Sequence, residues 1–174
     1  TPYINVNKIH YRYNTRHYDE LEDSWLDGYA QNHFFPTAKN NMRAEFRGIV
    51  KATHLKPREF FTKTTMRKLN LQNGVLDIDT MALSPHSAEY GFKSVLPYAY
   101  DKTADCPTFE RMLENVTMKD KTMASNLLKF MGYALSNDRC KADKILILPG
   151  EGQNGKSRFL NVFRELGGHI EGHP

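Results

Sequence analysis

The apolar positions in the first half of the chain follow two different spacings. Residues 3–18 carry tyrosine, histidine and isoleucine between turn-prone asparagines, and this composition predicts short strands or a hairpin. From residue 25 to residue 30 the apolar positions recur at helical spacing, behind Asp23 or Ser24 as a cap. A second stripe over residues 42–50 has the same spacing, so two helices are expected after the strands.

The second half of the chain begins with an alternating pattern and continues with helical ones. Residues 66–83 alternate around Asn73-Gly74, which is a strong sequence signal for a hairpin. One helix is predicted from near Pro107, a favourable first helical residue, and a longer one behind Asp120. The continuous apolar run at residues 145–148 predicts a strand that is covered on both faces.

A glycine-rich stretch follows this predicted strand and precedes a last amphipathic helix that ends near Leu166. Its order, Gly-Glu-Gly-Gln-Asn-Gly-Lys-Ser, fits the phosphate-binding loop of nucleotide hydrolases. Glycines let backbone N–H groups point at a phosphate, and the helix N-terminus adds positive potential. Lys156 is expected to reach the β- and γ-phosphate oxygens of ATP, and the Ser157 hydroxyl to bind magnesium. The candidate nucleotide-binding residues are Gly150, Gly152, Asn154, Gly155, Lys156 and Ser157. The alternative is a glycine-rich turn that binds nothing.

Hydrolysis of ATP in such enzymes also needs an acidic residue on another strand to hold the magnesium ion. No strand is predicted after Leu166 to supply it, so we expect the chain to be a piece of a longer protein and no complete catalytic site within it. The predicted fold class is α+β. A small mixed domain of hairpins and helices is expected at residues 1–142, followed at 143–174 by the first strand-loop-helix unit of a P-loop NTPase fold.

The segment before the loop carries a more specific pattern. It consists of an Asn-Gly-Val-Leu-Asp hairpin, a Pro-His pair, an apolar segment that reaches a proline and a Tyr-Asp, and then Cys-Pro and a helix. The matching residues are Asn73, Gly74, Leu76, Asp77, Pro85, His86, Pro97, Tyr100, Asp101, Ala104, Cys106 and Pro107. With LLKFMGYALSND and the phosphate loop behind it, residues 66–168 resemble the segment before the motor in phage, plasmid and poxvirus primase-helicases. Residues 1–65 match this family only loosely.

The resemblance implies a superfamily 3 helicase, which forms a ring and moves along single-stranded DNA at the expense of ATP, often joined to a primase or primase-polymerase. The longer protein would thus replicate the DNA of a bacteriophage or another mobile element in the host cell cytoplasm. ATP and magnesium would be its cofactors, and single-stranded DNA and further copies of itself its partners. The chain itself would be a structural or DNA-engaging module that needs no cofactor.

Two other functions are compatible with the residues. Asp77 and Asp79 form an Asp-x-Asp on a predicted strand, where both carboxylates would share one face and could hold two metal ions for nucleotidyl transfer. A hairpin whose polar face carries two aspartates explains the same residues without a metal. The second alternative is a pure oligomerisation collar between copies of the chain.

A basic stretch lies between the predicted helices and the hairpin. Residues 51–68 contain six basic side chains and one acidic one, with two phenylalanines among them. Cations that follow phosphates and aromatic rings that stack on bases are what single-strand binding requires. The candidate DNA-binding residues are Lys51, Lys56, Arg58, Phe60, Lys63, Arg67 and Lys68. A solvated basic surface over two core phenylalanines is the alternative.

The composition narrows the class of protein without deciding the function. With 174 residues, 40% of them hydrophobic and 25% charged, the chain is long enough for one medium domain or two small ones. Cys106 and Cys140 are far apart and lack a CxxC pair, which excludes a zinc ribbon. The net charge of +4 permits contact with nucleic acid but does not argue for it alone. No apolar run has the length of a membrane span, and no signal peptide is visible.

Overall fold

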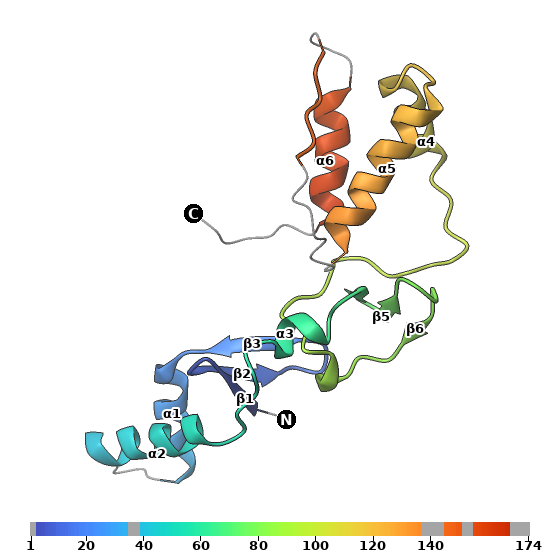
Figure 1. Ribbon diagram of the computed structural model, residues 1–174. Coiled ribbons are helices and arrows are strands. Elements are labelled where there is room, and N and C mark those ends of the chain that lie inside the picture. The colour runs from blue at the N-terminus through green and yellow to red at the C-terminus, as the bar shows by residue number, and fades with distance from the viewer. Residues whose placement is uncertain (1–2, 35–38, 137–144, 151–154, 168–174) are drawn as a thin grey trace. The chain divides into compact units, whose positions relative to one another are not determined.

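The structure, a computed structural model, is mixed α/β. It describes all residues except 1–2, 35–38, 137–144, 151–154 and 168–174 (Figure 1). The described part contains two small three-stranded antiparallel sheets and six α-helices, so the predicted α+β class is confirmed. The chain divides into two compact units: unit 1 comprises residues 1–65 and 85–95, and unit 2 comprises residues 66–84 and 96–174. The domain boundary predicted at residue 142 lies outside the described residues.

The first sheet of unit 1 is a meander of three short strands. β1 (Tyr3–Val6), β2 (Ile9–Tyr13) and β3 (Tyr18–Leu21) pair in this order, each antiparallel to the next. Their buried tyrosine and aliphatic side chains form a cluster against which Phe60 and Phe61 pack. The strands predicted for this N-terminal segment are confirmed, and the aromatic residues that suggested them form the core.

Three α-helices and one 3-10 helix complete unit 1. α1 (Asp23–His33) begins after Glu22, one residue before the predicted cap, and α2 (Asn40–Ala52) follows it. α3 (Phe60–Lys63) is a single turn, and the 3-10 helix η1 (Ala88–Tyr90) comes from the later segment of the unit. Both helices that the apolar stripes predicted are therefore present.

The second sheet belongs to unit 2 and contains the predicted hairpin. β4 (Lys68–Leu71) pairs with β5 (Gly74–Asp77), which pairs in turn with β6 (Leu83–Ser84), all antiparallel. Because Leu71 lies opposite Gly74, the turn consists of Gln72 and Asn73 and not of Asn73 and Gly74. The hairpin is confirmed and its turn lies one residue earlier than predicted.

Asn73 and Gly74 have separate structural roles in this hairpin. The Asn73 side chain donates to the Tyr100 carbonyl and accepts from the Tyr100 N–H, both at 2.9 Å. Gly74 has a φ of +149°, and a Cβ at this position would lie 2.5 Å from the Ser84 carbonyl oxygen. The asparagine thus ties the turn to a distant segment, and the glycine lets β6 approach β5.

Three helices form the other part of unit 2 (Figure 1). They are α4 (Pro107–Val116), α5 (Lys121–Leu135) and α6 (Lys156–Leu166). The Asp120 carboxylate caps α5, as predicted, by accepting from the N–H groups of Thr122 at 2.8 Å and Met123 at 3.0 Å. Among the described residues, none of these helices or of those in unit 1 is both long and apolar enough to span a bilayer.

The strand predicted at residues 145–148 is not formed in the structure. No described strand pairs with this segment, and its side chains alternate in exposure. Ile145 and Ile147 are 87% and 78% exposed, whereas Leu146 and Leu148 pack against the helical core. A strand buried on both faces needs neighbouring strands and a second covering layer. Here one face of the segment lies on helices, so the continuous apolar run has a covered side and an open side.

Candidate nucleotide-binding site

The candidate phosphate loop is described at both of its ends. Gly150 and Gly155 have φ values of +146° and +82°, which side chains with a Cβ rarely adopt. Gly155 is also the N-cap of α6, so Lys156 and Ser157 are its first two helical residues. Gly152 and Asn154 lie outside the described residues. The predicted loop-to-helix transition is therefore present, with glycine where the backbone requires it.

Lys156 joins the two ends of the loop. Its ammonium group donates to the Gly150 carbonyl oxygen, with 2.9 Å between Nζ and the oxygen. The side chain thus runs back from the first turn of α6 toward the start of the glycine-rich segment. This places a positive charge beside the loop, where the sequence motif predicts that phosphate oxygens bind.

The first turn of α6 is electrostatically unusual. Lys156 and Arg158 are both cations, and the turn contains no acidic residue. Gly155 has no side chain that could cap the first N–H groups, and these groups carry the positive end of the helix dipole. Ser157 lies exposed at the same end. Such a helix end stabilises an anion, whereas its own cations oppose the dipole.

A shared core fixes α6 against the two preceding helices. Phe159 is fully buried, and it packs with Leu113 of α4 and with Leu127 and Met131 of α5. The backbone of Phe159 donates to the Gly155 carbonyl at 3.1 Å, so the glycine that begins α6 is tied to the buried turn.

The end of α4 comes close to this glycine. A Cβ on Gly155 would lie 2.7 Å from Cγ2 of Val116, the last residue of α4. The last turn of α4 therefore packs directly on the end of the glycine-rich loop.

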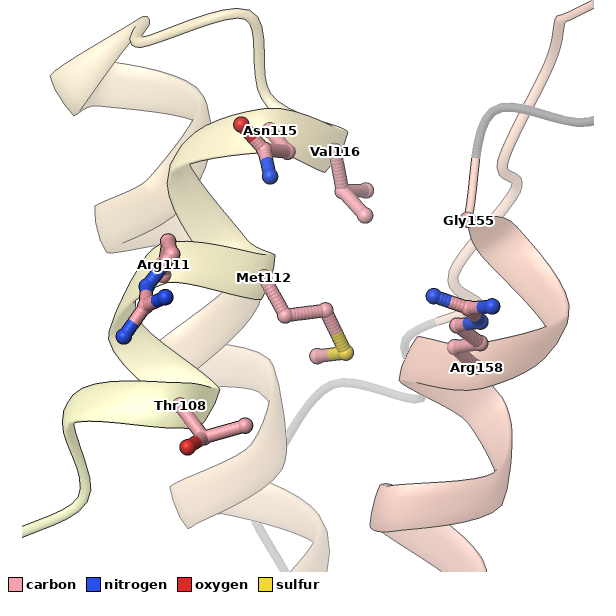
Figure 2. A pocket seen from close by; sticks show the side chains of 7 residues that line it. All are labelled: Thr108, Arg111, Met112, Asn115, Val116, Gly155 and Arg158. Carbon is pink, nitrogen blue, oxygen red and sulfur yellow. The ribbon is translucent and has the colours of Figure 1, made fainter.

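A cavity of about 410 Å³ lies between α4 and α6 (Figure 2). α4 supplies one wall with residues from Thr108 to Val116, and α6 supplies the other with Gly155 and Arg158. The described residues of the lining include two arginines, Arg111 and Arg158, and no carboxylate. No sequence motif marks these α4 residues: Thr108, Arg111 and Asn115 occupy exposed polar positions, and Met112 and Val116 belong to the apolar stripe of the helix.

The described residues suit the phosphate chain of ATP better than they suit a magnesium ion. Glycines with positive φ, a lysine at the loop and an uncapped helix end suit the phosphates of ATP. For magnesium, the exposed Ser157 hydroxyl is a candidate ligand. The described residues contain no group of three or more histidine, cysteine or acidic side chains that could hold a metal ion. The structure therefore offers a place for phosphate and one oxygen ligand for the ion.

The two aspartates of the alternative metal site are held by cations. Asp77 ends β5, whereas Asp79 lies in the following turn, so the expectation that both share one face of a strand is wrong. The Lys68 ammonium lies 2.5 Å from Asp77 Oδ2 and, with hydrogen bonds from Thr80, holds the pKa of Asp77 well below its ordinary value. The Arg67 guanidinium binds Asp79 through both carboxylate oxygens and lowers the pKa of that carboxyl. The pair forms a hairpin ion-pair network.

The same ion pairs involve part of the predicted DNA-binding stretch. Arg67 and Lys68 belong to unit 2 and contact the two aspartates, whereas the stretch from residue 51 to residue 63 belongs to unit 1. Phe60 is half-buried in the aromatic core of unit 1, and the Lys56 ammonium lies 5.6 Å from the centre of its ring. Arg58 and Lys63 are exposed and form no ion pair with a described residue. DNA binding by this stretch remains a prediction, and these two cations are the members best placed to contact phosphates, since they are exposed and without an ion pair among the described residues.

Lys51 takes part in a polar ladder between α1 and α2. Three residues of α1, spaced four apart, each contact one of three residues of α2 with the same spacing, and the two helices run antiparallel. The pairs are Gln31 with Arg43, Asp27 with Arg47 and Asp23 with Lys51. The ladder uses the charged side of α2 to hold the two helices together, and no residue of α2 is buried.

Comparison with protein families identifies the larger part of the chain. Residues 3–118 match the family described as D5 N terminal like, whose domain is found in primase-helicase proteins of phages, plasmids and viruses. No curated protein matches the chain. The match includes both sheets and α4 and ends before the phosphate loop. The N-terminal segment, which resembled the family only loosely, therefore lies inside the family domain.

Proposed function

Because the chain belongs to the D5 N-terminal-like family, we propose that it works in a replicative primase-helicase of a virus or another mobile element, an ATP-dependent DNA-unwinding protein. In this protein the loop at residues 150–157 binds the phosphates of ATP. Lys156 contacts the phosphate oxygens, and Ser157 contributes its hydroxyl to magnesium, which neutralises charge on the phosphates. The family domain at residues 3–118 supports the motor and engages single-stranded DNA.

The observation that carries this proposal is the conflict at the start of α6. A lysine and an arginine occupy the positive end of a helix that has no acidic residue in its first turn. A cation at this end costs about 0.3–1 kcal/mol in an exposed helix. Local conflicts of this kind are expected at functional sites, where a ligand supplies the missing charge. A glycine-rich turn that binds nothing would gain stability from an acidic residue there.

Removal of the Lys156 charge tests the proposal. In the full-length protein that contains this sequence, Lys156→Ala should abolish ATP hydrolysis and DNA unwinding. Lys129→Ala is the matched control, because Lys129 is an exposed lysine on α5 that does not line the cavity beside the loop. Equal activity of the two variants would show that the loop does not bind the phosphates.

The 174-residue chain alone should bind ATP weakly and should not hydrolyse it. Among the described residues, no carboxylate lines the cavity beside the loop and no group of three or more potential metal ligands is present, so we expect the acid that holds magnesium to be missing. We expect a Kd in the millimolar range, which corresponds to a binding free energy of about −4 kcal/mol. Micromolar binding by calorimetry, or turnover that Lys156→Ala removes, would mean that the site is more complete.

Self-association of the chain is a second candidate function, which α2 favours. Its charged side faces α1, and Met42 and Ile49 of its apolar stripe are 42% and 60% exposed. In a ring of copies such a stripe would lie against a neighbouring copy. In analytical ultracentrifugation, the apparent mass of the chain should then rise with its concentration. Ile49→Glu should reduce this rise, and Asn41→Glu on the same helix should not. A monomer at all concentrations would exclude this contact.

A further inference from the structure

The cavity between α4 and α6 has no role in the function proposed so far. Its volume of about 410 Å³ falls within the range of small-molecule sites. Gly155 forms part of its wall, and the same glycine is the last residue of the loop before α6. A ligand whose phosphates lie at the N-terminus of α6 would therefore have this cavity directly beside it.

The lining of the first cavity contains side chains that suit an anion. Arg111 of α4 and Arg158 of α6 both line it, and neither forms a hydrogen bond or ion pair with another described residue. A guanidinium group presents five N–H donors in a geometry that matches phosphate. Asn115 adds a side-chain amide to the same wall. In the described part of the chain these side chains have no hydrogen-bond partner, so a phosphate chain would find donors on both helices.

A second cavity adjoins the first and is mostly apolar. It has a volume of about 820 Å³ and shares Thr108, Met112 and Arg158 with the first cavity. Phe109 and Val162 are among its apolar lining residues. The first cavity thus has two arginines in its lining, and the second, toward the start of α4, is mostly apolar, with Arg158 and Asp105 as its charged residues. A nucleotide has the same two ends, an anionic phosphate chain and a flat base with apolar faces.

We propose that the nucleoside end of the bound nucleotide enters these adjoining cavities, so that α4 forms part of the nucleotide site. Arg158 and Arg111 flank the phosphate chain, and the base packs on the apolar wall that Met112 begins. This inference rests on the proposed function, since it takes the loop to hold the phosphates. It adds residues of the family domain, which ends at residue 118, to a site that the loop motif alone does not define.

Cys106 offers a direct probe of this proposal. It is exposed and lines the apolar cavity. In a Cys140→Ser variant of the chain it is the remaining cysteine of the sequence, so the rate of labelling by a thiol reagent reports on it alone. Saturating ATP should slow the labelling several-fold, because the base covers the cavity. Inorganic tripolyphosphate, which has no nucleoside, should bind the loop and leave the labelling rate unchanged.

The outcomes separate this inference from the function on which it rests. Binding of ATP and tripolyphosphate is followed independently by chemical-shift titration up to millimolar concentrations. If Lys156→Ala weakens both ligands but ATP leaves Cys106 labelling unchanged, the loop function stands and the nucleoside site is wrong. If neither ligand binds, or Lys156→Ala changes nothing, both proposals fail. Protection by tripolyphosphate equal to that by ATP also contradicts a nucleoside in the cavity.

Charge-removing variants test the two arginines. Arg158→Gln and Arg111→Gln should each weaken ATP binding about tenfold, because a hydrogen bond to a charged group is lost. Arg164→Gln is the matched control, since Arg164 is exposed on the same α6 helix and lines neither cavity. If Arg111→Gln behaves like this control, α4 does not contact the nucleotide and the inference is wrong.

Discussion

Replacement of Phe159 by alanine would remove the side chain that fixes α6 to the rest of unit 2. Phe159 is fully buried and packs with residues of α4 and α5. Truncation of such a phenylalanine costs about 3–5 kcal/mol, from lost burial and from the cavity that remains. Small domains are stable by about 5–15 kcal/mol, so this single change should remove a large part of the stability of the helical core.

A suitable assay for this prediction is urea unfolding followed by far-ultraviolet circular dichroism. Leu160→Ala provides the matched control, since Leu160 is the next residue of α6 and is 44% exposed. Leucine and alanine have similar helix propensities, so this change should cost less than about 1 kcal/mol. The difference between the two variants then reports on packing and not on helix formation.

The result also tests the packing of α6 on α4 and α5. If Phe159→Ala costs no more than Leu160→Ala, α6 does not pack on α4 and α5. The cavity between α4 and α6 would then lose its second wall, and the assignment of Arg111 to the nucleotide site would fall with it. If the large cost is found, the last helix of the family domain and the helix after the glycine-rich loop share one core.

Three further predictions concern other parts of the chain. His10 is 4% exposed, and burial lowers its pKa. The unfolded chain therefore binds a proton first as the pH drops below 6.5, and the free energy of unfolding should fall, less steeply in His10→Gln. Urea unfolding at several pH values measures this. Gly155→Ala should weaken ATP binding, because alanine is strained at a φ of +82° and its Cβ would collide with Val116; titration against wild type tests it. If the exposed cations Arg58 and Lys63 each contact a phosphate of single-stranded DNA, their double change to glutamine should flatten the logarithmic salt dependence of binding by about 1.4, and an unchanged slope would refute it.

The elements that the sequence predicted correctly are those that local interactions decide. The cap of α5 depends on Asp120 and the two N–H groups that follow it, all within three residues. The hairpin at Asn73 depends on two adjacent alternating runs, and helices α4 and α6 depend on the spacing of their own apolar residues. Such features need no knowledge of the rest of the chain.

The predictions that failed, or that no sequence pattern could supply, depend on distant residues. Residues 145–148 are continuously apolar, but whether they form a strand depends on neighbours to pair with. Arg111 and Arg158 lie on exposed positions of two different helices, where a sequence pattern indicates only solvent contact. Because Phe159 is buried against Leu113, α4 and α6 pack together, and Arg111 and Arg158 line the same cavity.

The boundary between the family domain and the glycine-rich loop in the sequence is not a boundary in the packing. The family match ends at residue 118, before the loop, yet Leu113 shares a buried cluster with Phe159. At the same place Val116 leaves no room for a side chain on Gly155. Because interiors are close-packed, a ligand that shifts the start of α6 must also shift the end of α4 or lose these contacts. If the loop binds a nucleotide as proposed, its occupation would therefore be coupled to the family domain through α4.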